Sequence, residues 1–479
     1  MKDSVSLVLY PSPGVGHLVS MVELGKFILN HYPSFSITIL IPTPPFNLGS
    51  VTSYINRVST TTPSITFHHL PSVPFSLDSN SSPHHETLIF EFLRLNIPNV
   101  HHALQTISQS STIRAFIFDF FCINSLDVAA AFNIPAYCYY TSAASCLALF
   151  LYFPTIHRNT TQSFKDMDAH LEVPGLPPVP ARDMVKPILD RTDKAYTGLL
   201  NMSTHLPKSS GVIVNTFVSL EIRAIKALSN GVCVPEAPTP PIYYIGPVIA
   251  ADDRTGGGGS YTTECLTWLD SQPSRSVVFL CFGSLGLFSA VQLKEIAVGL
   301  EKSGQRFLWV VRSPPNEDTS KRFSELPPEP DLDALLPEGF LERTKDRGLV
   351  VKSWAPQTAV LKRESVGGFV THCGWNSILE AVTAGVPMVA WPLYAEQRLN
   401  RVLLVEEMKL ALWMHESEDG FVSAAEVEKQ VRGLMESEEG KAIRKRTLAM
   451  RDGSSAAMSE GGSSLIDLAK LVDIWRMRQ

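Results

Sequence analysis

The chain has 479 residues, of which 44% are hydrophobic and 18% are charged, and its formal net charge is -6. This composition is typical of a globular protein with a sizeable core, and the length fits two or three domains. A mildly acidic chain lacks the positive surface that a phosphate backbone requires, so we expect no nucleic-acid partner. The seven cysteines include no Cys-x-x-Cys pair, which favours buried free thiols in a reducing compartment.

Neither a targeting segment nor a membrane anchor is expected. The first residues lack a basic leader followed by a long apolar segment. No apolar run approaches the roughly 18 to 20 residues that span a bilayer. The sequence therefore predicts a cytoplasmic protein without a membrane span.

Short apolar runs alternate with helical patterns in the first half of the chain. We expect strands at residues 5–10, 36–41, 115–118 and 136–140, and helices at 18–29 and 125–132. A loop containing Gly14 and Gly16 follows the first strand. Strands that alternate with helices predict βαβ units and a parallel sheet.

The same alternation starts again in the second half. Strands are expected at 277–282, 307–311, 349–351, 368–371 and 387–390, and helices at 291–303 and 376–384. Residues 235–260 between the two halves are rich in Pro and Gly, which is linker composition. The Gly-Gly-Gly-Gly-Ser tract at 256–260 is regular enough to be an engineered loop, and a natural linker is the equal alternative. Residues 313–335 are predicted to be a surface insertion.

These patterns predict how the chain divides into domains. Residues 1–250 are expected to form an N-terminal domain that binds the acceptor and carries the catalytic base. A linker at 251–264 leads to a C-terminal nucleotide-sugar domain at 265–455. The last residues, 456–479, are expected to form a helix that packs back on the N-terminal domain.

The segment around Gly374 predicts an anion site. A buried strand ends near His372, Gly374 permits a sharp turn, and Asn376 or Ser377 then opens a helix. A helix N-terminus that follows a parallel strand binds anions through its N–H groups and its dipole. Glu380 lies one helical turn after Asn376, where a carboxylate can hold a vicinal diol. Each residue alone has a structural reading as a helix cap, a solvated charge or a core histidine. Together they predict a site for a diphosphate and a ribose.

Three motifs within residues 354–397 carry a more specific resemblance. They are Trp-Ala-Pro-Gln at 354–357, His-Cys-Gly-Trp-Asn-Ser at 372–377 and Trp-Pro-Leu-Tyr-Ala-Glu-Gln at 391–397. In this register they resemble the signature box of plant secondary-product UDP-dependent glycosyltransferases, of the inverting family 1. The resemblance extends over the whole chain, including Gly-Val-Gly-His at 14–17. It implies a GT-B type α/β fold, in which two Rossmann-like parallel-sheet domains face each other across a cleft.

The resemblance also implies roles for the residues that match the family's motifs. The implied donor-binding residues are Trp354, Ala355 and Gln357 at the uracil and ribose, Glu380 at the ribose hydroxyls, Ser284, His372, Gly374, Asn376 and Ser377 at the diphosphate, and Trp375, Glu396 and Gln397 at the sugar. Thr141 is a further candidate sugar contact. In this family a terminal Gln usually accompanies UDP-glucose, and Trp375 stands where an Arg would suit glucuronic acid. Glucose is therefore the expected sugar.

A catalytic pair is predicted in the first half. His17 follows a strand and a glycine-bearing loop and stands just before a helix, whose N-terminus favours the neutral imidazole. Asp119 ends an apolar strand, where a carboxylate is costly unless it is paired. A carboxylate on the second ring nitrogen would stabilise the imidazolium. A helix-capping or core histidine is the alternative for His17, and Asp127, inside the following helix, is a weaker candidate partner. The family's catalytic His and Asp match His17 and Asp119.

This pair implies a mechanism of inverting transfer. His17 would take the proton of an acceptor hydroxyl, and the oxygen would attack the anomeric carbon from the face opposite UDP. We expect no metal ion and no cofactor other than UDP-glucose as co-substrate, with peptide dipoles stabilising the departing diphosphate. An NAD site is excluded, because Val19 stands where the third glycine of a dinucleotide motif would follow Gly14 and Gly16.

The acceptor site is the least defined part of the prediction. Candidate lining residues are Leu18, Phe120, Phe121, Leu147, Tyr394 and the helical stretch 86–95, any of which could instead be core. The resemblance implies a small phenolic acceptor such as a flavonoid, isoflavone or chalcone, which suits an aromatic-lined slot. A monomer is expected. The alternatives are a UDP-sugar epimerase or hydrolase of the same architecture and a sugar-nucleotide binder without catalysis. The sequence does not distinguish O- from C-glycosylation.

Overall fold

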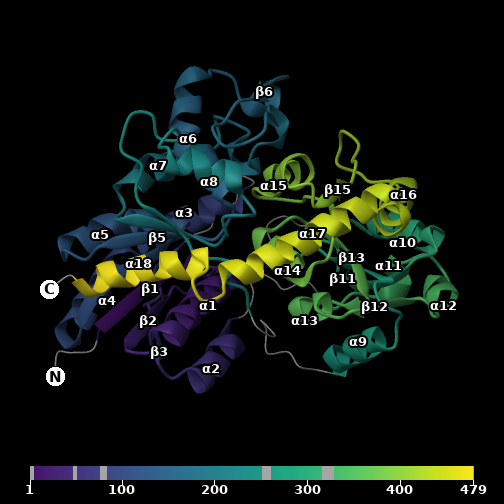
Figure 1. The fold of residues 1–479 in the computed structure, drawn as a ribbon, viewed down its shortest axis with the longest axis horizontal. Coiled ribbons are helices and arrows are strands. Elements are labelled where there is room, and N and C mark those ends of the chain that lie inside the picture. Colours follow the sequence, from purple (N-terminus) through teal and green to yellow (C-terminus); the bar gives the residue numbers. More distant parts are fainter. Residues whose placement is uncertain (1–4, 47–50, 76–83, 251–259, 316–327, 478–479) are drawn as a thin grey trace. The chain divides into compact units, whose positions relative to one another are not determined.

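The computed structural model describes residues 5–46, 51–75, 84–250, 260–315 and 328–477. For residues 260–263 it describes the backbone only. The chain divides into two compact units, one made of residues 1–250 and 456–479 and the other of residues 251–455. Each unit is built around one large parallel sheet with helices packed against it (Figure 1). Among the described residues, every helix is too short or too polar to cross a membrane.

The first unit contains a seven-stranded sheet in the order β3-β2-β1-β4-β5-β8-β9, and all of its neighbouring strands are parallel. Its strands are β1 (Val5–Tyr10), β2 (Phe35–Ile41), β3 (Ile65–His69), β4 (Thr112–Asp119), β5 (Ala136–Tyr140), β8 (Gly211–Val214) and β9 (Ile242–Tyr244). The central strands are apolar and buried on both faces, as parallel strands between helices must be. A small antiparallel pair, β6 (His170–Leu171) and β7 (Val179–Pro180), lies apart from this sheet.

The helices of the first unit lie between these strands along the chain, except for the last one, which follows the second unit. They are α1 (Val15–His31), α2 (Thr52–Thr61), α3 (His85–Leu95), α4 (Ile97–Ser110), α5 (Leu126–Ala131), α6 (Ala144–Asn159), α7 (Lys194–His205), α8 (Ile222–Ser229) and α18 (Ser463–Met477), with short 3-10 turns η1 (Phe120–Ser125), η2 (Phe164–Asp166), η3 (Ala181–Asp183), η4 (Lys186–Ile188) and η5 (Leu206–Lys208). Residues of α1, α2 and α18 form one hydrophobic core with β1, β2, β4 and β5.

The C-terminal helix α18 is anchored to the sheet of the first unit (Figure 1). The Trp475 ring is completely buried and makes edge contacts with Phe35 and Tyr137. Asp467 accepts a hydrogen bond from the Tyr244 backbone N–H at 3.0 Å, which ties the helix to β9. The last helix of the chain is thus an integral part of the first unit.

The second unit contains a six-stranded parallel sheet in the order β12-β11-β10-β13-β14-β15. Its strands are β10 (Val277–Cys281), β11 (Arg306–Val311), β12 (Gly348–Lys352), β13 (Val366–Thr371), β14 (Met388–Ala390) and β15 (Ala411–Trp413). Its helices are α9 (Ser260–Asp270), α10 (Ala290–Ser303), α11 (Leu332–Leu335), α12 (Phe340–Thr344), α13 (Gln357–Leu361), α14 (Trp375–Ala384), α15 (Gln397–Val402), the π-helix η7 (Leu403–Glu407), α16 (Ala424–Glu436) and α17 (Glu438–Ala457), where α17 leads back to the first unit. Residues of α10 and α16 form the main core with the strands.

These two parallel sheets confirm the predicted α/β fold class, but several element boundaries differ. Helix α1 begins at Val15 instead of residue 18. Its N-cap is Gly14, with φ 122°, so the loop after β1 is shorter than predicted. The helix expected at 125–132 is α5, at Leu126–Ala131, and the 3-10 turn η1 precedes it. Strand β9 lies inside the Pro-rich stretch 235–260, where it pairs with β8.

The predicted linker and insertion also differ from the structure. Helix α9 starts within the linker expected at 251–264. Helix α11 occupies the end of the insertion expected at 313–335. The glycines of the tract at 256–260 lie outside the described residues.

Candidate active site

The predicted catalytic and donor residues lie at equivalent places in the two sheets. In the first sheet the strand order reverses between β1 and β4, because β2 and β3 follow on one side and β5 on the other. In the second sheet the reversal falls between β10 and β13. Ligands of open α/β sheets bind at such switch points, beyond the carboxyl ends of the strands. His17 and Asp119 flank the first switch point, and Ser284 and His372 flank the second.

The first of these sites holds a hydrogen-bonded pair. His17 Nδ1 lies 2.7 Å from Asp119 Oδ2. Asp119 is 1% exposed, and its Oδ1 accepts a hydrogen bond from the Phe121 N–H at 3.0 Å. Because the carboxylate only accepts hydrogen bonds, Nδ1 carries the proton of the neutral imidazole, and Nε2 is the nitrogen able to accept one.

His17 does not stand before the helix, as predicted, but in its first turn. Gly14 is the N-cap of α1, so the ring of His17 lies beside N–H groups that have no partner within the helix. The side chain of His17 is 31% exposed, whereas that of Asp119 is buried. The histidine is therefore the accessible member of the pair.

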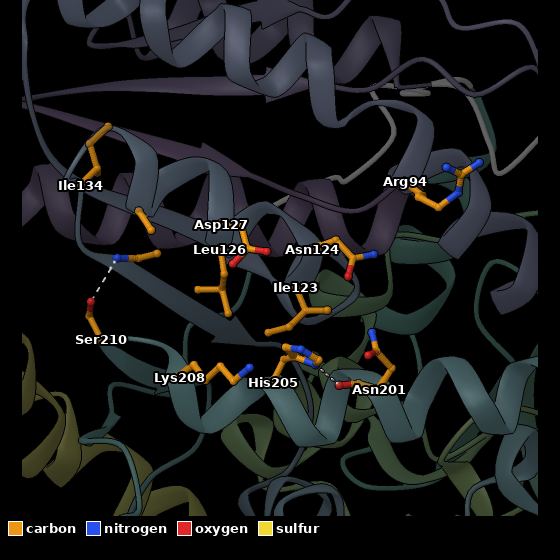
Figure 2. A pocket seen from close by; sticks show the side chains of 12 residues that line it. Arg94, Ile123, Asn124, Leu126, Asp127, Ile134, Asn201, His205, Lys208 and Ser210 are labelled. Atoms are coloured by element: carbon orange, nitrogen blue, oxygen red, sulfur yellow. Dashed lines mark hydrogen bonds between the residues drawn. The ribbon is translucent and has the colours of Figure 1, made fainter.

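Asp127, the weaker candidate partner, lies elsewhere. It lines a hollow of about 580 Å³ together with Asn124 and Lys208 (Figure 2). This hollow also contacts Ala136, the first residue of β5, and Ser210, which directly precedes β8. It therefore lies at the amino ends of these strands, at the edge of the sheet opposite to Asp119.

The predicted acceptor residues divide into two groups. Phe121 is half-buried, and its ring contacts the His17 ring edge-on with centroids 5.6 Å apart. Phe90 of α3, within the predicted stretch 86–95, lies against Phe121 at 5.7 Å. Leu18, Phe120 and Leu147 are buried in the core. The structure thus places Phe121 against the histidine and Phe90 against Phe121, whereas the other three residues are part of the core.

Thr141 directly follows β5, whose Tyr139 is paired in register with Asp119 of β4. The helix α6 that begins three residues later is capped by a distant carboxylate. Glu221 is 3% exposed and accepts hydrogen bonds from the N–H groups of Ala144 and Ser145 at 2.8 and 2.9 Å. Burial raises the pKa of Glu221. No sequence motif marks this cap, which fixes the start of α6 three residues after Thr141.

In the second unit, the segment predicted to bind an anion is a strand, a turn and a helix, but the helix α14 begins at Trp375 instead of Asn376 or Ser377. Strand β13 ends at Thr371, Gly374 is the N-cap of α14, and a glycine has no side chain with which to cap the helix. The ring of His372 is 6% exposed and lies between two glycines. A Cβ atom added to Gly283 or to Gly374 would lie 2.6 or 2.5 Å from His372 Nε2. Only glycine at both positions leaves room for this ring.

The residues predicted to hold the base and ribose converge from two helices. Gln357 begins α13, and its Nε2 donates to Glu380 Oε2 at 2.7 Å and to Ser377 Oγ at 2.8 Å. Glu380 is 1% exposed. Trp354 is half-buried and follows Ser353, which adopts a positive φ of 63°. The first and central motifs of the box are therefore joined by direct side-chain contacts.

The last motif of the signature box, residues 391–397, is held by hydrogen bonds between its own residues. Gln397 begins α15, and its Oε1 accepts hydrogen bonds from the N–H groups of Leu393 and Tyr394, both at 2.9 Å. Glu396 is the N-cap of this helix. Burial raises the pKa of the Tyr394 hydroxyl to about 12. The Tyr394 ring lies 6.1 Å from the His372 ring, so this predicted acceptor residue is beside the predicted diphosphate residue.

One charged residue at this edge was not predicted. Arg312 directly follows β11, and its guanidinium donates a hydrogen bond to the backbone carbonyl of Ser284. Burial lowers the pKa of Arg312. A basic residue directly after a buried parallel strand is the sequence signal that could have identified it.

Two Asp-x-Asp tripeptides occur, at 166–168 and 331–333. Asp331 caps the short helix α11 by accepting from the N–H groups of Asp333 and Ala334. Asp168 is fully exposed and lies 3.7 Å from Arg182. Among the residues that the structure describes, no group of three or more His, Cys, Asp or Glu side chains is arranged to hold a metal ion.

Comparison with known proteins identifies the family. Residues 239–441 match the family model for UDP-glucoronosyl and UDP-glucosyl transferases. The chain is 52% identical to UDP-glycosyltransferase 88B1 of Stevia rebaudiana, over 99% of both chains. It is 53% identical to the anthocyanidin 5,3-O-glucosyltransferase of a Rosa hybrid cultivar, again over 99% of both. It is also 53% identical to the phloretin 2'-O-glucosyltransferase of Pyrus communis, over 97% of this chain and 98% of that one.

A solved structure shares the fold. The Phytolacca americana enzyme UGT2, in complex with UDP-2fluoro-glucose and pterostilbene, matches 99% of this chain and all of that one with a TM-score of 0.87 and 38% identity. The sequence resemblance and the GT-B fold class are therefore confirmed. The chain belongs to the UDP-glycosyltransferase family and is a transferase of that kind.

Proposed function

We propose that this enzyme transfers glucose from UDP-glucose to a hydroxyl group of a small phenolic acceptor, such as a flavonoid, isoflavone or chalcone, with inversion at the anomeric carbon. The observation that carries the proposal is the contact of 2.7 Å between His17 and the buried Asp119 at a switch point of the sheet. The relatives named for anthocyanidins and phloretin support the choice of acceptor and of an O-glycoside.

The histidine acts as the general base. Asp119 holds Nδ1–H, so that Nε2 takes the proton of the acceptor hydroxyl. The oxygen forms a bond to the anomeric carbon, and the bond from that carbon to the diphosphate oxygen breaks, releasing UDP. The resulting imidazolium is stabilised by the adjacent carboxylate.

The donor is held by the signature box of the second unit. Trp354 stacks on the uracil, the backbone of Ala355 and the side chain of Gln357 contact the base and ribose, and Glu380 binds the ribose hydroxyls. The hydrogen bond between Gln357 and Glu380 supports this assignment, because it brings the two side chains together where one ribose could contact both.

The diphosphate binds at the N-terminus of α14. Its partners are His372, Gly374, Asn376 and Ser377, together with Ser284 from the loop after β10. The glycine N-cap leaves the start of the helix without a side-chain cap of its own, which suits an anionic ligand. The charge that develops on the departing diphosphate is met by these donors and by the helix dipole, and we propose that neither a metal ion nor a further cofactor takes part.

The sugar contacts are Trp375, Glu396, Gln397 and Thr141. Gln397 supports glucose as the preferred sugar, in keeping with the family's usual pairing. On the acceptor side, Phe121 and Phe90 supply an aromatic surface next to the base, since both are half-buried and one contacts the His17 ring. Tyr394 lies beside His372, so we assign it to the donor side.

The alternatives receive less support. The relatives described above are glycosyltransferases, not epimerases or hydrolases. A binder without catalysis would not require His17 and Asp119 to be paired. We further propose that the enzyme is a cytoplasmic monomer.

Mass-spectrometric screening of phenolic acceptors with UDP-glucose tests the proposal. We expect a product that gains one hexosyl unit and loses it on acid hydrolysis, as O-glycosides do. The same screen with UDP-galactose should yield less product. No hexosylated product from any phenol, or a preference for UDP-galactose, would contradict the proposed acceptor class or the proposed sugar.

A further inference from the structure

The short helix α15 contacts the turn at residues 372–374, here called the diphosphate turn, through a residue that lies outside the signature box. Asn400 is one helical turn after Gln397 and is 1% exposed. Its Nδ2 donates a hydrogen bond to the backbone carbonyl of Cys373 at 2.9 Å. The same helix therefore carries a predicted sugar contact and a side chain that holds the turn before α14.

The orientation of the Cys373 carbonyl determines the orientation of the next backbone N–H. Cys373 adopts φ 64°, a left-handed conformation that a residue with a side chain rarely takes. The carbonyl belongs to the same peptide unit as the N–H of Gly374, and a trans peptide is planar with its C=O and N–H directed oppositely. A hydrogen bond that directs the carbonyl toward Asn400 therefore directs the Gly374 N–H away from α15.

The helix that carries Asn400 is itself fixed. Arg401 is 2% exposed, and its Nη1 lies 3.0 Å from Glu416 Oε1. Its guanidinium lies 3.9 Å from the centroid of the Trp413 ring, at the end of β15. A partly buried ion pair and a stacked ring restrict rotation and sliding of α15, so Asn400 holds the turn from a fixed helix.

We propose that Asn400 is a positioning residue for donor binding: it sets the Cys373–Gly374 peptide so that the Gly374 N–H faces the diphosphate of the UDP-sugar. Because Gln397 lies on the same helix, α15 keeps the diphosphate turn and the sugar contacts at a constant separation. This inference rests on the proposed function, in which the turn binds the diphosphate.

Binding of UDP and of uridine to an Asn400→Leu variant tests the inference. Leucine has a similar volume but no N–H donor. Since a hydrogen bond contributes about 1 kcal/mol, we expect the affinity for UDP to fall by about fivefold to tenfold. The affinity for uridine, which has no diphosphate, should stay within twofold of wild type, and so should the KM for the phenolic acceptor. A general loss of structure would weaken both ligands together.

Two further variants keep the result interpretable. Asn400→Ala removes the donor without adding volume or charge, so it should weaken UDP selectively even if the leucine variant folds poorly. Val402→Ala opens a cavity in the same helix, because Val402 is 2% exposed, but removes no hydrogen bond to the turn. It should lower the melting temperature without separating UDP from uridine.

The outcomes distinguish this inference from the function on which it rests. If folded Asn400 variants bind UDP as tightly as wild type, or lose UDP and uridine equally, Asn400 does not position the turn. If the wild-type enzyme itself fails to bind UDP, the proposed function fails first and the inference fails with it.

Discussion

His17 Nδ1 lies 2.7 Å from Asp119 Oδ2, although 102 positions separate the two residues in the chain. They meet because β1 and β4 are neighbours in the sheet, and because one residue follows β1 while the other ends β4. The contact places a buried carboxylate behind a partly exposed imidazole. This arrangement gives the histidine a defined tautomer, which suits its proposed role as the base.

Replacing Asp119 by Asn should lower kcat by roughly 100-fold or more, because the imidazolium loses its carboxylate while the ring keeps a hydrogen-bond partner. The dissociation constant for UDP should not change. Steady-state kinetics and calorimetric titration with UDP check both expectations. Asp127→Asn is the matched control, since Asp127 lines the hollow at the other edge of the sheet and its replacement should leave kcat within twofold. Equal losses in the two variants would remove Asp119 from its assigned role.

Gln397→Glu separates two roles of one side chain. A carboxylate can still accept from the N–H groups of Leu393 and Tyr394, so the melting temperature should stay within a few degrees of wild type. The amide donor is lost, and UDP-glucose should therefore bind several-fold more weakly while UDP alone binds as before. Titration of both ligands checks this prediction. Unchanged binding of UDP-glucose would show that Gln397 only supports its loop.

The two glycines of the first loop should respond differently to alanine. Gly14 has φ 122°, where a Cβ is strained, so Gly14→Ala should destabilise the protein by about 1–3 kcal/mol and displace His17. Gly16 lies inside α1 with open space around its Cα, so Gly16→Ala should be neutral or stabilising by up to about 1 kcal/mol. Chemical denaturation of the two variants measures the difference. A reversed order of stability would contradict the described conformation of this loop.

The thiols should be unreactive in the native enzyme. All seven cysteines are free and buried. Burial raises the pKa of Cys233 to about 12 and that of Cys265 to about 11. A raised pKa leaves almost no thiolate at pH 8, and the thiolate is the reactive form. A chromogenic disulfide reagent should therefore label the native protein slowly and all seven thiols rapidly in denaturant, whereas rapid native labelling would show that at least one is exposed.

The sequence predicted the parts of the fold that depend on local pattern. Buried parallel strands such as β1, β4, β10 and β13 are short apolar runs, and those runs are visible without the structure. Strand β9 was missed because its Ile-Tyr-Tyr segment stands among prolines and becomes a strand only by pairing with β8. Helix α1 was placed three residues late, because the conformation of Gly14 cannot be read from periodicity.

In the candidate site, too, the sequence identifies the residues that a local pattern or motif marks, but not those that only tertiary contacts bring together. His17, Asp119 and the signature box could be proposed from the sequence because they occupy strand ends and match a family motif. The contacts of Glu221, Arg312 and Asn400 with backbone groups join segments far apart in the chain, and only the tertiary structure brings these partners together. Supporting residues of this kind carry no motif of their own.

Product formation and UDP binding by a His17→Ala variant test the central claim most directly. We predict that hexosylation of a phenolic acceptor from UDP-glucose falls below about 1% of the wild-type rate, as expected when a general base is removed. The dissociation constant for UDP should remain within twofold of wild type. A variant that still transfers glucose at a near-normal rate would contradict the assignment of His17 as the base.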